Sequence, residues 1–234
     1  MKNIAYPLIL TAALISAAPA ATLIQTKSFA FLPDDSQDLT YNKFDTSLGS
    51  LISVSVSVTL NKTGGQFEVD NDSTTAGTIT LEHNVIGGLS VVSGDVGLLR
   101  DDLTAIGSNG SLTASSVMPA REVFGTSGDD TDTFDATGQS DYVRFNPADA
   151  SVSDSGTIAS FAQSAFEGTG TFVLRANALQ SVNVTGLGGL QQAITVANVS
   201  GEVTVTYNYM PIPEPASALL GGIGCLLLLR RPRR

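Results

Sequence analysis

Residues 51–60 read Leu-Ile-Ser-Val-Ser-Val-Ser-Val-Thr-Leu, and this stretch decides the fold class. Its apolar side chains recur at every second position, which is the period of a β-strand and not the 3.6-residue period of an α-helix. The alternation therefore predicts a strand with one buried face and one polar face. The residues expected on the buried face are Ile52, Val54, Val56, Val58 and Leu60.

A second alternating stretch runs from Val203 to Tyr209, near the C-terminal end. Its valines and tyrosines share one face, and its threonines and asparagine share the other. Just upstream the alternation changes phase, so we expect a bulge or kink between Val196 and Asn198. These two stretches predict two half-buried strands.

Weaker strand patterns occupy much of the chain between the two ends, about 190 residues and enough for one sizeable core. Gly, Asn, Asp and Ser separate these patterns, and no internal repeat is visible. Leu98 to Ile106 and Ile158 to Phe166 are expected to be short helical or irregular excursions. The fold class we predict is all-β, an antiparallel β-sandwich or jelly roll. The weaker strands are expected at Thr22–Phe31, Thr78–Val85, Leu89–Val92, Leu112–Met118, Tyr142–Phe145, Gly170–Arg175 and Ser181–Val184.

The last residues of the sequence form three consecutive parts with different chemistry. Pro213-Glu214-Pro215 comes first, then an apolar run over residues 216–229, then a basic tail over residues 230–234. The two prolines fix their φ angles and remove two backbone donors, so a helix in the apolar run begins afresh after them. With about 14 residues, that helix is shorter than the roughly 20 needed to cross a bilayer core unless the membrane thins or arginine stems extend outward. The basic residues are Arg230, Arg231, Arg233 and Arg234.

This order of parts resembles the PEP-CTERM sorting signal, which spans residues 210–234 here. The resemblance implies recognition of Pro213, Glu214 and Pro215 by an exosortase, an integral-membrane processing enzyme of Gram-negative bacteria that make extracellular polysaccharide. The four arginines fit a cytoplasmic stop-transfer position under the positive-inside rule, which places the preceding domain outside. The alternative is a buried C-terminal helix of the domain, but such a helix should show a polar face.

The N-terminal end predicts export as well. Lys2 precedes a small, apolar segment from Ile4 to Ala18, as in a secretory signal peptide over residues 1–20. We expect signal peptidase to cleave after Ala20, with Ala18 and Ala21 as alternative positions. A membrane anchor that is never cleaved is the other interpretation.

The charge changes when both ends are removed. The full chain has 12 basic and 22 acidic residues, and the part between the signals keeps 7 and 21, a net charge of about −14. Such a domain should repel nucleic acid and anionic polysaccharide, so we expect no nucleic-acid partner. Solubility, cation binding and contact with neutral glycans remain as roles for the charge.

Two further stretches carry a second resemblance. Phe44-Asp-Thr-Ser-Leu-Gly-Ser-Leu51 and Gly201-Glu-Val-Thr-Val-Thr-Tyr-Asn-Tyr209 resemble the opening and the final strand of the choice-of-anchor E domain. The resemblance implies one extracellular β-domain over residues 21–209 joined to a C-terminal anchoring signal. It supplies no catalytic residues.

The sequence offers little for catalysis or for zinc. His83 is the only histidine, and its phase within Thr78–Val85 places it inward or at a strand end. No nucleophile elbow is present, and Ser-Lys chemistry finds no support in the spacing of Lys62 or the other lysines. One histidine and Cys225, which lies in the apolar tail, cannot form a typical zinc site. We therefore predict a protein that is not an enzyme.

An acidic loop is the candidate metal site. Asp130, Asp132 and Asp135 alternate with threonines between glycines, and Ca²⁺ prefers oxygen ligands of this kind. The spacing departs from an EF-hand loop, and a solvated acidic loop is the alternative interpretation. Calcium is the only cofactor that the sequence suggests.

These features predict an exported protein that is held transiently in the inner membrane and ends at the cell surface or in the extracellular matrix of a Gram-negative bacterium. Its expected partners are signal peptidase, exosortase and, as a candidate, extracellular polysaccharide. A structural or adhesive role is the leading hypothesis. The alternatives are a calcium-dependent glycan-binding module and a secreted polysaccharide hydrolase or lyase with acidic-loop carboxylates as acid and base.

The strand assignment at residues 51–60 generates the first test. Val56→Asp should lower the free energy of unfolding by several kcal/mol, because it places an unpaired carboxylate in the core. Ser55→Asp, on the polar face, should have a much smaller effect. Urea unfolding of both variants measures the difference, and equal effects would mean that the two faces are wrongly assigned.

Overall fold

The computed structural model describes residues 19–125, 134, 140–212 and 224, and β-strands are the main secondary structure within them. Two short 3₁₀ helices, η1 (Thr46–Leu48) and η2 (Ser160–Phe166), are the exceptions. The predicted all-β class is therefore confirmed. The strands are β1 (Ala21–Phe31), β2 (Asp35–Asn42), β3 (Gly49–Thr63), β4 (Gln66–Asn71), β5 (Gly77–Ser93), β6 (Thr113–Val117), β7 (Arg121–Val123), β8 (Tyr142–Phe145), β9 (Ala150–Thr157), β10 (Thr171–Thr185), β11 (Leu190–Thr195) and β12 (Asn198–Pro211).

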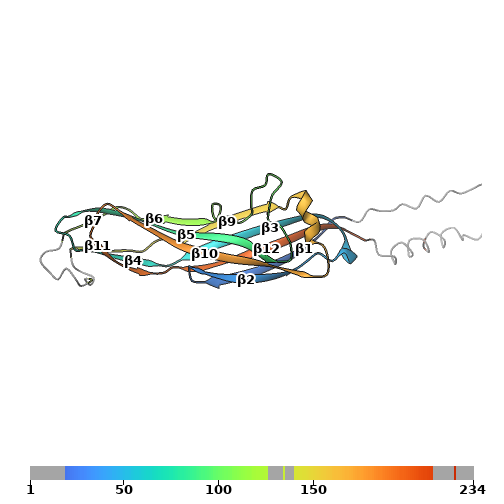
Figure 1. Cartoon of the computed structure of the whole chain (residues 1–234), viewed down its shortest axis with the longest axis horizontal. Helices are drawn as coiled ribbons and strands as arrows, with labels where there is room; N and C mark the ends of the chain where they lie inside the picture. Colours follow the sequence, from blue (N-terminus) through green and yellow to red (C-terminus); the bar gives the residue numbers. More distant parts are fainter. Residues whose placement is uncertain (1–18, 126–133, 135–139, 213–223, 225–234) are drawn as a thin grey trace, which may run out of the picture.

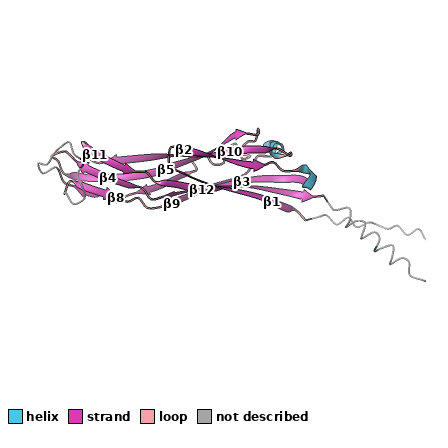
Figure 2. Ribbon diagram, turned by 90° about the horizontal axis from the view of Figure 1, so that it is seen from below, coloured by secondary structure: helices cyan, strands magenta, loops and turns pink. Residues whose placement is uncertain are grey.

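The strands form two antiparallel layers that pack face to face along a long molecule (Figures 1 and 2). The first layer has the strand order β1-β12-β3-β9. The second has the order β2-β10-β5-β6, and β7 also pairs with β5. Each layer turns one face to the other, which explains why the strands alternate between apolar and polar residues.

The first layer is interrupted along one line and continues as the sheet β11-β4-β8. The chain crosses this line three times between consecutive strands. It passes from β3 to β4 through Gly64-Gly65, from β8 to β9, and from β11 to β12. The predicted kink between Val196 and Asn198 lies on it, where β11 ends and β12 begins. We call this line the break. The second layer has no such interruption, because β5 and β10 pair with each other past it.

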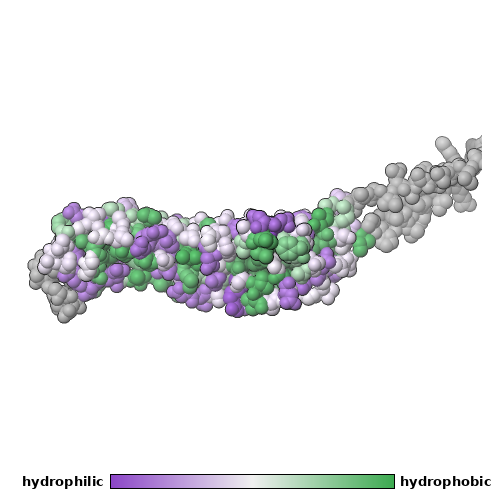
Figure 3. All heavy atoms as spheres, turned by 45° about the horizontal axis from the view of Figure 1, so that its top comes forward, coloured by the Kyte–Doolittle hydropathy of each residue, from purple (hydrophilic) through white to green (hydrophobic). Residues whose placement is uncertain are grey.

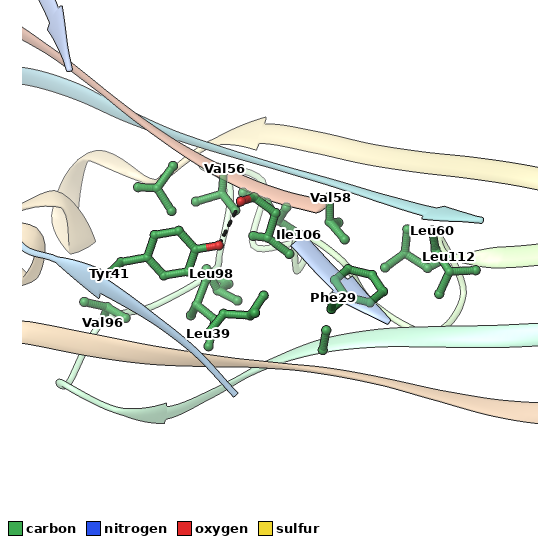
Figure 4. Packing of buried hydrophobic residues seen from close by; sticks show 14 of the residues in the cluster. Phe29, Leu39, Tyr41, Val56, Val58, Leu60, Val96, Leu98, Ile106 and Leu112 are labelled. Atoms are coloured by element: carbon green, nitrogen blue, oxygen red, sulfur yellow. Dashed lines mark hydrogen bonds between the residues drawn. The ribbon is translucent and has the colours of Figure 1, made fainter. Parts of the chain in front are cut away.

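The break divides the buried apolar residues into two clusters. The larger lies between the two layers and includes Val56, Leu60 and Leu174. Figure 4 shows part of it, with the valines of β3 facing Tyr41, Leu39 and Leu98. The smaller cluster lies beyond the break and includes Phe67 and Leu81.

Two buried tyrosines join the layers reciprocally. Tyr41 of β2 donates its hydroxyl hydrogen to the Val203 carbonyl of β12 at 2.8 Å, the bond drawn in Figure 4. Tyr207 of β12 donates to the Asn42 carbonyl of β2, also at 2.8 Å. Burial raises the pKa of both tyrosines well above 10. The hydroxyl group of each tyrosine is thus hydrogen-bonded, while its ring packs in the core.

The prediction for residues 51–60 is confirmed with one correction. Val54, Val56, Val58 and Leu60 are buried, but Ile52 is 50% exposed. Asn208 pairs with Ser53 and Tyr209 with Leu51, so Ile52 is the extra residue of a β-bulge and turns outward. Alternation within one strand could not reveal a bulge that depends on the neighbouring strand.

Other strand predictions were too short. Thr78–Val85 and Leu89–Val92 form one strand, β5, and the predicted strands Gly170–Arg175 and Ser181–Val184 form one strand, β10. Gly87 and Gly88, which lie between the two predicted segments, are inside β5 and make room for neighbouring side chains. Strands β2, β4, β7, β9 and β11 were not predicted, because they carry few apolar residues or are short. The excursions are confirmed: residues 98–106 are irregular, and η2 lies within residues 158–166.

The tyrosine pair generates a test of how the layers are joined. Tyr41→Phe should lower the free energy of unfolding by about 1–2 kcal/mol, because it removes a buried hydrogen bond and leaves the ring in place. Above pH 10 the unfolded tyrosines lose their protons while the folded ones keep them, so wild-type stability should fall as the pH rises.

The double variant Tyr41→Phe, Tyr207→Phe should therefore lose less stability between neutral and alkaline pH than the wild type. Urea midpoints at several pH values measure both effects. If the stability of the double variant fell as steeply at alkaline pH as that of the wild type, the result would contradict the assignment of the pH dependence to these two tyrosines.

Candidate functional site

The two ends of the described domain lie side by side. Ala21, the first residue of β1, pairs with Tyr209 of β12, and both strands reach the same end of the molecule (Figures 1 and 2). Ala20, the expected cleavage position, is exposed just before β1, whereas Ala18 lies outside the described residues. The sorting residues Pro213, Glu214 and Pro215 and the four arginines also lie outside them. The domain therefore meets both predicted signals at one end.

The most reactive set of side chains in the described part of the chain is a buried cluster. Lys62 of β3 reaches across the sandwich, and its Nζ lies 3.3 Å from His83 Nδ1 and 2.6 Å from Ser116 Oγ. His83 and Lys62 are fully buried, and Ser116 is 8% exposed. Of the two positions predicted for His83, inward or near a strand end, the structure shows the first. None of the three residues lines either of the surface hollows described below.

The position of this cluster at the break gives it a structural role. Ser116 donates to the Ala148 carbonyl at 2.7 Å, in the segment between β8 and β9. Gln180 accepts from the Ala197 amide, and Asp149 accepts from the Gly64 amide, both on the same line. The side chains thus bind backbone groups that the interrupted ladders leave unpaired. A nucleophile held in this way has no route to a polymeric substrate.

Burial also sets the protonation of the cluster. Desolvation lowers the pKa of His83, and the nearby charge of Lys62 lowers it further. Desolvation lowers the pKa of Lys62 as well, and the carboxylate of Asp149 partly opposes this. His83 is therefore neutral near pH 7, with one ring nitrogen available to accept from the lysine.

The predicted calcium ligands Asp130, Asp132 and Asp135 lie outside the described residues. At the neighbouring turn, Asp70 and Asn71 are buried, and the Asn71 amide donates to the carbonyls of Thr75 and Phe124. Within the described residues, no group of three or more His, Cys, Asp or Glu side chains is arranged to hold a metal ion.

The outer face of the first layer carries a regular array of hydroxyl groups, which we call the hydroxyl face. Antiparallel pairing aligns Ser and Thr residues of four strands in rows, with inter-strand bonds such as Thr26 Oγ1 to Thr204 Oγ1 at 2.9 Å and Ser55 Oγ to Thr157 Oγ1 at 3.2 Å. The rows are Ile24, Thr206, Ser55 and Thr157, then Thr26, Thr204, Ser57 and Ser155, then Ser28, Glu202, Thr59 and Ser153.

A shallow hollow of about 210 Å³ lies in the middle of this face, lined by β3, β9 and Thr206. Glu202 is the one charged residue in the three rows, although the domain as a whole is strongly acidic. The alternating serines of residues 51–60 indicated a polar face, but its width depends on the pairing of β9 and β1, which no local pattern reveals.

Exposed aromatic rings are scattered over the described surface. Phe161 of η2 is 65% exposed and Phe124 is 52% exposed, whereas Phe166 and Tyr207 are in the core. On the face shown in Figure 3, apolar and polar side chains alternate in small groups along the whole length. The rings do not gather into one platform.

Comparisons with known proteins give no functional lead. No family model and no curated protein matches the sequence. Among solved structures, the chain is similar to that of the infectious bursal disease virus Gx strain, with 12% identity over 93% of this chain and 48% of that chain, at a TM-score of 0.19. T=1 particles derived from the same virus give 11% identity over 91% and 41%, at a TM-score of 0.18. The chain spans less than half the length of these proteins, and TM-scores this low carry no argument.

Within the described part of the chain, no helix has the length and apolar character to cross a membrane.

The buried cluster generates a prediction on pH. The pKa of His83 is lower in the folded state than the 6.5 of an unfolded chain, so only the unfolded state gains a proton as the pH falls below about 6.5. Wild-type stability should therefore drop between about pH 7 and pH 5.5. His83→Gln should flatten this drop, because it removes the group that titrates. The urea midpoint at the two pH values measures it, and an unchanged slope in the variant would contradict a neutral buried histidine.

Proposed function

We propose that the chain is an exported cell-envelope or exopolysaccharide-matrix protein, processed through a PEP-CTERM signal and acting as a structural or adhesive, non-catalytic component. The observation that supports the proposal is the pairing of Ala21 with Tyr209, because it brings together the two residues that lie next to the proposed signal peptide and the proposed sorting signal.

An end-on attachment suits the shape of the domain. The strands β5 and β10 have 17 and 15 residues, so at about 3.4 Å per residue the sandwich extends roughly 50 Å or more along them. A chain attached at the Tyr209 end holds the opposite end and both outer faces away from the membrane. Residues 1–20 would direct export, and the helix of residues 216–229 would hold the protein until exosortase acts.

An adhesive role draws on the outer faces of the domain. The hydroxyl face offers donors and acceptors in rows and only one charge, which favours contact with a neutral, hydroxyl-rich polymer over an anionic one. The one cluster that combines a serine, a lysine and a histidine is occupied in binding backbone groups at the break. These observations favour a structural role over hydrolysis.

We also propose that the sandwich is a jelly roll. The support is its strand order, in which β1-β12-β3-β9 faces β2-β10-β5-β6. Eight strands in this order correspond to two interlocked Greek keys, the arrangement of a jelly roll. The remaining strands, β4, β7, β8 and β11, extend this core beyond the break.

The test of the proposed function is processing in the native host. Replacing Pro213-Glu214-Pro215 with three alanines should leave the protein in the inner membrane with its tail uncut, because the prolines keep the recognised peptide out of the following helix. Deleting Arg230 to Arg234 should instead weaken retention before processing, because the positive charges stop transfer.

Fractionation and mass spectrometry of wild type and both variants, in hosts with and without exosortase, measure the outcome. The mature wild-type protein should begin near Ala21 and lack its tail only when exosortase is present. Identical tail removal in every strain would overturn the proposed processing.

A further inference from the structure

A polar groove of about 530 Å³ lies on the outer face of the second layer. Strands β2, β10 and β5 and the segment after Gly107 surround it. The groove is on the opposite side of the sandwich from the hydroxyl face, since each occupies the outer face of a different layer. Its volume lies within the range of about 300–1,000 Å³ that is typical of small-ligand sites.

A glycine forms the floor of this groove, and two amide side chains meet above it. A Cβ atom on Gly88 would lie 2.5 Å from Asn109 Oδ1 and 2.6 Å from Asn177 Oδ1. Gly88 does not have a positive φ, so its backbone does not require glycine. The missing side chain therefore serves to leave space where the two amides converge.

The backbone beneath both amide groups is fixed, and the amides themselves, on the exposed Asn109 and the half-buried Asn177, are not used within the protein. Asn177 projects from β10, directly opposite Gly88 in the ladder. The segment that carries Asn109 is fixed by Asp154, which accepts from the Gly107 amide and from Ser111 Oγ, both at 2.8 Å. Among the described residues, neither amide group has a hydrogen-bond partner. Unpaired amides on a fixed backbone leave donors and acceptors free for a ligand at a small entropic cost for the main chain.

The charges around the groove select the kind of ligand. Arg175 is neutralised by Asp38, with bonds of 2.6 and 3.0 Å to its two carboxylate oxygens. Asp34 and Asp35 also line the groove, and within the described part of the chain neither forms an ion pair with a basic side chain, which disfavours anions. Amides, hydroxyls and carboxylates together suit a ligand with many neutral hydroxyl groups. The aliphatic side chains of Leu89 and Leu179 can contact the C–H face of such a ligand.

We propose that the groove over Gly88 binds one or two sugar units of a neutral polysaccharide, with Asn109 and Asn177 as the groups that contact ring hydroxyls. The inference deepens the proposed function, since a location in the matrix supplies such a polymer. Side-chain amides can donate and accept at once, so each can bind a pair of adjacent hydroxyls.

The experiment uses the full chain in a detergent without a sugar headgroup, and the probes are the neutral disaccharides cellobiose, maltose, lactose and mannobiose. Saturation-transfer NMR and titration calorimetry should detect millimolar binding of at least one of them. A disaccharide containing glucuronic acid should bind at least about tenfold more weakly, because the carboxylates of the groove repel it.

Three variants test the geometry. Gly88→Ala should weaken binding by at least about tenfold, because its Cβ displaces both amides, while the melting temperature should change little since only side-chain ends must move. Asn177→Ala should weaken binding to a similar degree. The matched control is Gly110→Ala on the neighbouring segment, where a Cβ meets nothing within 4 Å, and it should bind as the wild type does.

The proposal is overturned if none of the four disaccharides binds, or if Gly88→Ala binds as tightly as Gly110→Ala. A rise in melting temperature with calcium alone, without any response to sugar, would also overturn it and would assign the groove to a cation. Each of these results leaves the processing experiment untouched, because that experiment measures the fate of the tail and not the binding of a ligand.

Discussion

A buried backbone group must find a hydrogen-bond partner, and this constraint governs the structure at the break in the first layer. Where the ladders of β3, β8 and β11 stop, backbone groups of Gly64, Ala148 and Ala197 lose their ladder partners, and of these three residues Ala197 is fully buried while Gly64 and Ala148 lie at the surface. Asp149, Ser116 and Gln180 bind them. The second layer spans the break without interruption, so β5 and β10 hold the two parts of the first layer in line.

This constraint also explains where the reactive side chains lie. Lys62 reaches from the first layer to Ser116 and His83 of the second because the break leaves room for polar atoms between the two apolar clusters. The chain has one histidine, and the structure uses it as a neutral, buried acceptor. The types of these side chains could suggest catalysis, but their buried positions give them a role in stabilising the fold.

The outer faces of the sandwich are left for interaction. The hydroxyl face offers a nearly uncharged surface four strands wide, and the groove over Gly88 offers a confined site with two amides on the other side. Both are polar and neither favours anions, which agrees with the acidic charge of the domain. Because β1 and β12 reach the same end, attachment there leaves both surfaces accessible.

The sequence by itself determined the all-β class, the inward face of residues 54–60 and 203–207, and the inward position of His83, because alternation is a local property of a strand. It also predicts the two terminal signals, most of whose residues lie outside the described part of the chain. It could not reveal the bulge at Ile52, the single long strands β5 and β10, or the polar strand β9, since these depend on pairing with residues far away in the chain. The sequence did not reveal the groove either, because Gly88 becomes its floor only through the packing of Asn109 and Asn177 over it. Tertiary structure decided these features because the space around a residue depends on the residues that pack against it. Those residues come from distant parts of the chain, and the pairing of distant strands brings them together.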